Sequence, residues 1–179
     1  CCDNRKSQPY IPHSSGNINN VSIVMKEKDW GSGLGEDARN IIGDIYEGLP
    51  VDEPNFKFFY TSPKQFSGFS RHSRNIIYFQ KDTTNKFTIY KDLYSKPQLF
   101  FLIQGEDEDI LSNYLLENKS LIINTIKDGE RREKIRRIRK SLSKSNVLSE
   151  RIGIKLVYPS IYKTVKDTFN FVWLENQIL

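Results

Sequence analysis

The feature that most constrains the fold is an almost continuous apolar run between Gln98 and Gln104. Five consecutive residues within it, Leu99 to Ile103, are large and apolar. A strand with one face in water alternates apolar and polar residues, whereas a strand covered on both faces does not. The run therefore predicts a central strand in a sheet whose two faces are both covered.

Shorter β-branched and aromatic runs predict further strands at 21–26, 56–60, 75–80, 86–91, 152–158 and 169–174. The turn at 83–85 predicts that the strands on either side of it form a hairpin. Apolar residues at helical spacing predict helices at 35–47 and 106–126, and Asp128-Gly129 predicts a break before a basic helix at 130–143. This order predicts an α+β fold in which two to three helices pack on one face of a mostly antiparallel sheet.

Composition narrows the class of protein. The chain has 179 residues, of which 37% are hydrophobic and 12% aromatic, and this suffices for one core. The mean hydropathy is -0.56, and no apolar run is long enough to predict a membrane-spanning helix. Two cysteines exclude a disulfide scaffold, and two histidines are too few for a histidine-built metal site, so we expect no cofactor. The net charge of +5 permits an acidic partner without requiring one.

Cys1 is the residue that says most about the cellular location of the protein. A chain that starts with Cys fits cleavage before that residue, as in bacterial lipoproteins, whose new terminal Cys is acylated. Residues 1–19 are polar and predict a flexible tether, and residues 20–179 are expected to form a single α+β domain. Whether the protein continues beyond Leu179 stays open. Cys2, in place of an Asp, favours the outer membrane, and the scarcity of acidic residues after Cys1 favours its periplasmic face over the cell surface.

Two basic clusters are candidate binding sites. Arg71, His72 and Arg74 precede a predicted strand, where the arginines could bind a carboxylate or another anion. The alternative is a solvated loop whose arginines donate to carbonyl groups at the strand end. Arg132, Arg136 and Arg139 belong to the predicted basic helix, which could face nucleic acid, anionic lipid headgroups or an acidic partner. The alternative there is a solvated helix face.

Other patterns favour structural roles. Gly31 to Gly35 lies between a strand and a helix, as a phosphate-binding loop would, but lacks the dinucleotide spacing and is followed by two acidic residues. The aromatic residues of the strands are expected to be core, because the motif of RNA-binding sheets is missing. A nucleic-acid binder that uses the basic helix would conflict with export, so we expect no nucleic-acid partner. No pattern of nucleophile and base is present, so no catalytic residue is predicted.

Several short segments resemble those of one family. They are Asn20 to Met25, Asp29-Trp30, Gly48-Leu49-Pro50, Glu53-Pro54, Arg71 to Ile77, Lys96 to Leu99, Gly153 to Leu156 and Phe171 to Leu174. Through these segments, the chain resembles the N-terminal portion of the Bacteroidota lipoproteins grouped as domain of unknown function 4837. The resemblance extends from about residue 20 to residue 175. The resemblance implies an envelope lipoprotein and transfers no site residue.

Together these observations predict a non-enzymatic accessory subunit of an envelope membrane-protein complex, held at the outer membrane by acylated Cys1. Its expected partners are membrane lipid and outer-membrane proteins. The alternative is an envelope polymer hydrolase or carbohydrate-active domain whose catalytic residues the sequence does not identify.

Overall fold

The computed structural model describes residues 10–45, 50–51, 53–145 and 147–176. The chain divides into two compact units, an N-terminal unit of Cys1–Gly129 and a C-terminal unit of Glu130–Leu179, and each is described by itself. The single domain expected over 20–179 stays a prediction. Residues 1–9 of the expected tether, which include Cys1, lie outside the described residues. Further along it, the Ser14 and Ser15 amides donate to the carbonyl groups of Lys96 and His72.

The N-terminal unit is built on one five-stranded sheet. Its strands are β1 (Asn20–Val24), β2 (Lys57–Thr61), β3 (Asn75–Lys81), β4 (Lys86–Lys91) and β5 (Leu99–Gly105), in the order β2-β1-β3-β5-β4. The strands β2, β1, β3 and β5 are parallel to one another. Only the edge strand β4 runs antiparallel within this sheet, against β5. The sheet is therefore mixed and mostly parallel.

The prediction of a mostly antiparallel sheet is wrong, and so is the hairpin between β3 and β4. The short turn does join these two strands, but β5 lies between them and pairs with both. Parallel neighbours need long crossover connections. The segments after β1 and β2 provide them, and β4 with its flanking loops provides the one between β3 and β5. Hydrophobic pattern does not distinguish such a crossover from a hairpin.

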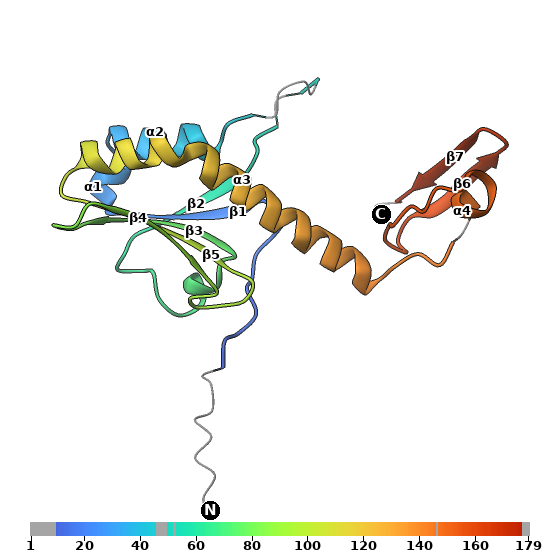
Figure 1. Cartoon of the computed structure of the whole chain (residues 1–179), viewed down its shortest axis with the longest axis horizontal. Helices are drawn as coiled ribbons and strands as arrows, with labels where there is room; N and C mark the ends of the chain where they lie inside the picture. The colour runs from blue at the N-terminus through green and yellow to red at the C-terminus, as the bar shows by residue number, and fades with distance from the viewer. Residues whose placement is uncertain (1–9, 46–49, 52, 146, 177–179) are drawn as a thin grey trace, which may run out of the picture. The chain divides into compact units, whose positions relative to one another are not determined.

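Helices cover one face of this sheet (Figure 1). They are the short α1 (Glu27–Trp30), α2 (Gly33–Ile42) and the first part of α3 (Glu108–Lys140). Apolar side chains of these helices meet alternate residues of the strands in a fully buried core. Its members include Val21, Ile23, Leu34, Ala38, Ile42, Ile77, Phe101, Ile103, Leu111, Leu115, Ile122 and Ile126. The location of this core fixes which residues of each strand point to the opposite face.

The opposite face carries a smaller cluster beneath the loop that joins β2 to β3. Its buried members are Val24, Phe66, Ile76 and Phe100. The loop includes a short 3-10 helix, η1 (Gly68–His72), which lies on the side of the sheet away from α2 (Figure 1). Both faces of β5 are therefore covered, as its apolar run predicts: Phe101 points to the main core and Phe100 to the smaller cluster.

Helix α3 is a single helix where the sequence predicts two. It runs through Asp128 and Gly129 without a break. The Asp107 carboxylate accepts a hydrogen bond from the Ile110 amide at 2.8 Å and so caps the first turn. A Cβ on Gly129 would lie 3.2 Å from Leu99 Cδ1, so close packing against β5 accounts for a glycine here. The described residues contain four α-helices, not the two or three expected.

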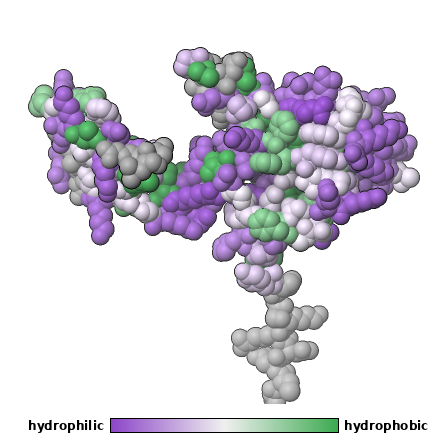
Figure 2. All heavy atoms as spheres, turned by 180° about the vertical axis from the view of Figure 1, so that it is seen from behind, coloured by the Kyte–Doolittle hydropathy of each residue, from purple (hydrophilic) through white to green (hydrophobic). Residues whose placement is uncertain are grey.

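The C-terminal unit contains the last part of α3, α4 (Val147–Ile152), and a two-stranded antiparallel sheet of β6 (Lys163–Thr168) and β7 (Phe171–Glu175). The strand predicted at 169–174 is confirmed by β7, but the one at 152–158 is wrong, because 154–158 form no strand. Large apolar side chains here are exposed, Phe171 and Trp173 among them. Figure 2 shows such hydrophobic patches among hydrophilic ones.

Candidate functional site

A groove lies on the face of the sheet opposite α2, over β3, β5 and β4. Its volume is about 430 Å³. Five aromatic side chains line it: Phe66, Tyr78, Tyr90, Tyr94 and Phe100. Arg71, Gln80, Leu93, Leu102 and Pro63 complete the lining. Among the described residues of this lining, Arg71 is the one that carries a charge. An apolar, aromatic concavity with a few polar groups is typical of a small-molecule site.

The register of β3, β4 and β5 determines which residues form the floor of this groove. Phe100 on β5 lies between Ile76 on β3 and Tyr90 on β4, and Leu102 on β5 lies beside Tyr78 on β3. Residues two apart on a strand share a face. The floor is therefore set by hydrogen-bonded strands rather than by mobile loops, and only one side of it depends on the 63–71 and 93–94 segments.

The aromatic rings pack against one another. Tyr78 and Phe100 are stacked with their ring centroids 5.8 Å apart, and Tyr94 meets Phe100 edge-on at 5.7 Å. Phe66 makes edge-on contacts with Tyr78 at 5.5 Å and with Tyr94 at 5.9 Å. Rings held in this way lose little further freedom when a ligand stacks on them, which favours binding.

Arg71 is fixed above these rings. Its Cζ lies 5.0 Å from the centroid of Tyr94 and 5.7 Å from that of Phe66, within range of a cation–π interaction. Its Nε donates to the Phe66 carbonyl at 3.2 Å. Burial raises the pKa of Tyr78 above its ordinary value, the nearby Tyr94 adds to the rise, and the Arg71 charge opposes it. The Tyr78 hydroxyl therefore stays protonated and can donate a hydrogen bond.

Gln98 holds the wall of the groove, and the sequence analysis assigned it no role. The side chain is buried, and its Nε2 donates to the carbonyls of Arg71 and Ser73, each at 2.7 Å. Its Oε1 accepts the Tyr94 amide at 2.9 Å. One amide group thus joins the two segments that carry Arg71 and Tyr94. A polar residue at the start of the most apolar run was the available signal.

His72 and Arg74 do not line the groove. Arg74 is buried and donates to the carbonyls of Gly16 and Asn17, at 3.4 and 2.7 Å, so its guanidinium joins the segment before β1 to β3. The His72 ring lies against the exposed Phe69, and its carbonyl accepts from Ser15. Of the three residues in this predicted cluster, the structure places Arg71 alone at the groove. The binding role of these three residues stays a prediction.

The second predicted cluster lies on the last turns of α3. Arg136 makes two hydrogen bonds to Glu133, at 2.6 and 2.8 Å, and Arg137 makes another at 2.8 Å. These bonds hold the pKa of the buried Glu133 at about 2. Arg132 and Arg139 are exposed. Part of the basic charge is thus compensated within the helix, while Arg132 and Arg139 remain available to an anionic partner.

The glycine-rich turn before α2 has a structural role. Glu108 accepts the Leu34 amide at 3.2 Å and the Ser32 hydroxyl, which hold the pKa of Glu108 below its ordinary value. A carboxylate of the protein therefore occupies the place of a phosphate at this helix start. Gly35 is required because a Cβ there would collide with the Trp30 carbonyl. Nearby, the buried Asp29 pairs with Lys81 at 2.8 Å.

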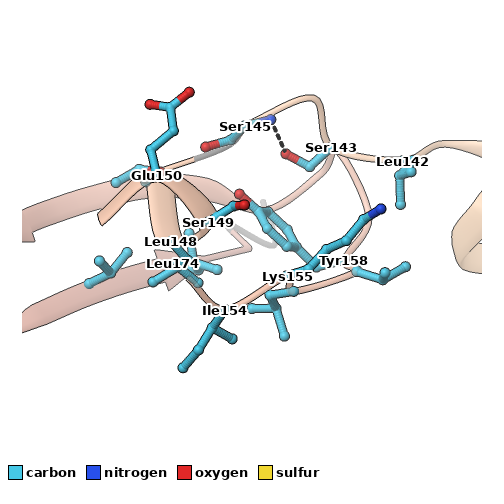
Figure 3. A pocket seen from close by; sticks show the side chains of 14 residues that line it. Leu142, Ser143, Ser145, Leu148, Ser149, Glu150, Ile154, Lys155, Tyr158 and Leu174 are labelled. Carbon is cyan, nitrogen blue, oxygen red and sulfur yellow. Dashed lines mark hydrogen bonds between the residues drawn. The ribbon is translucent and has the colours of Figure 1, made fainter. Parts of the chain in front are cut away.

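A second concavity, of about 360 Å³, lies within the C-terminal unit. Figure 3 shows Leu148, Tyr158 and Leu174 grouped there, with Glu150 pointing away from them. Ser145 donates its amide to Ser143 Oγ at 3.3 Å. Half of the lining residues are aliphatic, and no acid–base pair comes together within this described lining. We assign it no chemistry.

The described residues also limit other kinds of site. They contain no group of three or more His, Cys, Asp or Glu side chains arranged to hold a metal ion. Within the same ranges, no helix has the length and apolar character needed to cross a membrane. The lipidation predicted at Cys1 lies outside the described residues and stays a prediction.

The aromatic residues of the strands divide between two roles. Phe79 and Phe101 are core, as predicted, but Tyr90 is 38% exposed and Phe59 is 53% exposed. The alternation along 86–91 was the signal for this, since Phe87 and Ile89 pack on the main core and Tyr90 therefore points the other way. Sequence reasoning missed Tyr78 and Tyr90 as groove residues because it treated the strand aromatics as one set, and it missed Tyr94 because this residue lies outside the strands.

Comparison with known proteins corrects the family assignment. No curated protein and no solved structure matches the chain. Residues 14–139 match a family of unknown function that differs from domain of unknown function 4837, so the predicted resemblance is wrong, and no link to Bacteroidota is shown. Because the match covers well over half of its length, the chain belongs to the family described as Domain of unknown function (DUF8532).

Proposed function

We propose that the N-terminal unit is a non-enzymatic ligand-binding domain, and that the aromatic groove is its binding site. The observation that carries this proposal is the groove itself, in which five aromatic side chains and Arg71 converge on one face of a hydrogen-bonded sheet. Its volume lies in the range of small-molecule sites. No Asp or Glu lines it among the described residues, so it offers no carboxylate pair for acid–base work.

The surroundings of the groove support a binding role. Gln98 and the rings fix its wall, so that little order has to be gained when a ligand enters. The paired rings Tyr78–Phe100 and Tyr94–Phe100 line the concavity, and a flat ligand can pack against them.

A fragment screen followed by amide NMR tests the proposal. With the full chain, aromatic fragments are expected to shift the amide signals of β3, β5 and residues 93–94 as one saturable set. Tyr94→Ala should weaken this binding about ten-fold, because it removes one ring face and the Arg71 contact. The matched control is Phe69→Ala, which removes an exposed aromatic ring that does not line the groove. Amide shifts that scatter over the surface would contradict the proposal, and so would binding that is weakened by Phe69→Ala instead of by Tyr94→Ala.

We also propose, from the sequence expectation, that this domain serves an accessory subunit held at the outer membrane, on its periplasmic face, by acylated Cys1. Incorporation of radioactive palmitate into the wild-type protein, and its loss in Cys1→Ser, is the expected result. Copurification from native membranes in mild detergent then tests for an outer-membrane protein partner. Wild-type protein that takes up no palmitate would contradict the anchor without bearing on the groove.

A further inference from the structure

We infer that the groove is selective for a small planar organic acid, whose flat body packs on the tyrosine and phenylalanine rings and whose carboxylate binds Arg71. This inference rests on the proposed function and adds the chemical class of the ligand. It depends on three properties of the groove: its charge, the state of the Arg71 guanidinium, and its shape.

Charge gives the first argument. Arg71 is the charged member of the described lining, and the polar groups around it are neutral. A cationic ligand would meet a like charge, whereas an anionic ligand would be attracted to the guanidinium. Arg71 is exposed, so its charge can be reached by a ligand from solvent. The ligand is therefore expected to carry a negative group at the Arg71 end.

The guanidinium of Arg71 is held but not saturated. Nε is used by the Phe66 carbonyl, and the planar group is kept near the rings of Phe66 and Tyr94. Its two terminal nitrogens make no hydrogen bond in the part of the chain that the structure describes. The remaining N–H groups form the fork that matches the two oxygens of a carboxylate. A lysine could supply the charge, but not this bidentate geometry.

Shape gives the third argument. The rings of Tyr78 and Phe100 are stacked with an interplanar angle of 27°, and both line the groove. Tyr94 stands edge-on to Phe100, and Phe66 stands edge-on to Tyr78. A flat ring can lie on such a surface, whereas a branched aliphatic chain would make fewer contacts with it. Gln80 and the Tyr78 hydroxyl offer hydrogen bonds at the lining.

Matched acid and amide ligands test the inference on the full chain. The pairs are benzoate with benzamide, and 2-naphthoate with 2-naphthamide, each titrated at pH 7 and followed by the amide signals of β3 and β5. In the wild type we expect each acid to bind at least ten-fold more tightly than its amide, as a charge-assisted bidentate contact implies. Arg71→Gln should abolish the difference, and Arg71→Lys should restore only part of it.

Lys64→Gln is the control, because it removes one positive charge from an exposed residue next to Pro63 that does not line the groove. It should leave the preference for the acid unchanged. Amides that bind as tightly as acids in the wild type would overturn the ligand class and leave the groove as a binding site. If none of the four compounds shifts the groove signals, the ligand class is overturned, and the proposed function is contradicted only if the wider fragment screen also fails. The wild-type comparison of acid with amide decides the matter even if the Arg71 variants do not fold.

Discussion

Gln98 shows how one buried amide can determine the geometry of a binding surface. It makes hydrogen bonds to residues on two loops, which also meet through ring contacts and through the hydrogen bond from Ser95 Oγ to the His72 carbonyl. Gln98→Leu keeps a similar volume but leaves two carbonyl groups and one amide without a partner. We expect the free energy of unfolding to fall by about 2–4 kcal/mol. Urea melts measure this, and Gln65→Leu, at an exposed glutamine, should change stability by less than about 0.5 kcal/mol.

Glu133 predicts a pH dependence at the residue scale. Its pKa is about 2 in the folded chain, against an ordinary value of 4.5. A lowered pKa stabilises the folded state above pH 4.5, and this stabilisation is lost as the pH falls from 4.5 to 2. Its size is about 3 kcal/mol at most. Wild type should therefore exceed Glu133→Gln in stability at pH 7, and the difference should vanish near pH 2.

Denaturant melts of the two proteins across this pH range measure that difference. Glu117→Gln is the matched control, since Glu117 lies on the same helix but is exposed. A difference between wild type and Glu133→Gln that stays constant from pH 7 to pH 2 would show that the bonds to Arg136 and Arg137 do not set the pKa of Glu133.

At the scale of the element, β5 is where sequence reasoning and structure agree best. Its apolar run predicts a strand covered on both faces, and Phe101 is fully buried in the main core. Phe101→Ala should lower the free energy of unfolding by about 3–5 kcal/mol, because it removes a ring and leaves a cavity. Thermal and urea melts would show this, and Phe69→Ala, at an exposed ring, should cost far less. A loss below about 1 kcal/mol for Phe101→Ala would contradict the central position of β5.

The strands of the N-terminal unit also show which structural features cannot be predicted from the sequence. The five strands of the N-terminal unit were each predicted to within one or two residues, because local pattern sets their existence. The relative direction of these strands could not be predicted from local pattern. The choice between a crossover and a hairpin depends on which distant strand is available for pairing. Arg71 was predicted as a contact residue from its type. Its partners Tyr94 and Gln98 could not be predicted, since the strand register of β3 and β5 brings them together.

The exposed arginines on the last turns of α3 lead to a prediction about binding to anionic partners. Arg132 and Arg139 are exposed, while Arg136 is held by Glu133. Arg132→Glu with Arg139→Glu should leave the fold intact and weaken binding to anionic vesicles or to an acidic partner, most strongly at low salt. Vesicle cosedimentation and pull-downs across a salt series measure this. Unchanged binding in both assays would make this a solvated helix face.

At the scale of the whole molecule, the two units differ in charge and in core. Residues 130–179 carry 12 Lys and Arg against five Asp and Glu, although the whole chain has 27 against 22. The excess of positive charge therefore lies in the C-terminal unit. The buried core residues lie in the N-terminal unit, and the family match ends at residue 139.

This division predicts how fragments behave. A fragment of residues 10–140 contains the whole five-stranded sheet and α3, and it should unfold in one cooperative transition. A fragment of residues 141–179 should show none, because a two-stranded sheet with exposed apolar side chains is marginal by itself. Calorimetry of both fragments provides the measurement. Cooperative melting of the second fragment would contradict this assignment of stability.

The insertion of β5 between β3 and β4 has a consequence during synthesis. The ribosome releases β4 before β5, yet β5 is the strand with which β4 pairs. A pairing that waits for a later segment cannot form locally as the chain emerges. The apolar side of β4, with Phe87 and Ile89, therefore stays uncovered in the nascent chain until Gly105 has left the exit tunnel. A translational pause once Gly105 has left the exit tunnel would let this edge of the sheet close, whereas a pause while β5 is still inside the tunnel would prolong its exposure to chaperones and to neighbouring nascent chains.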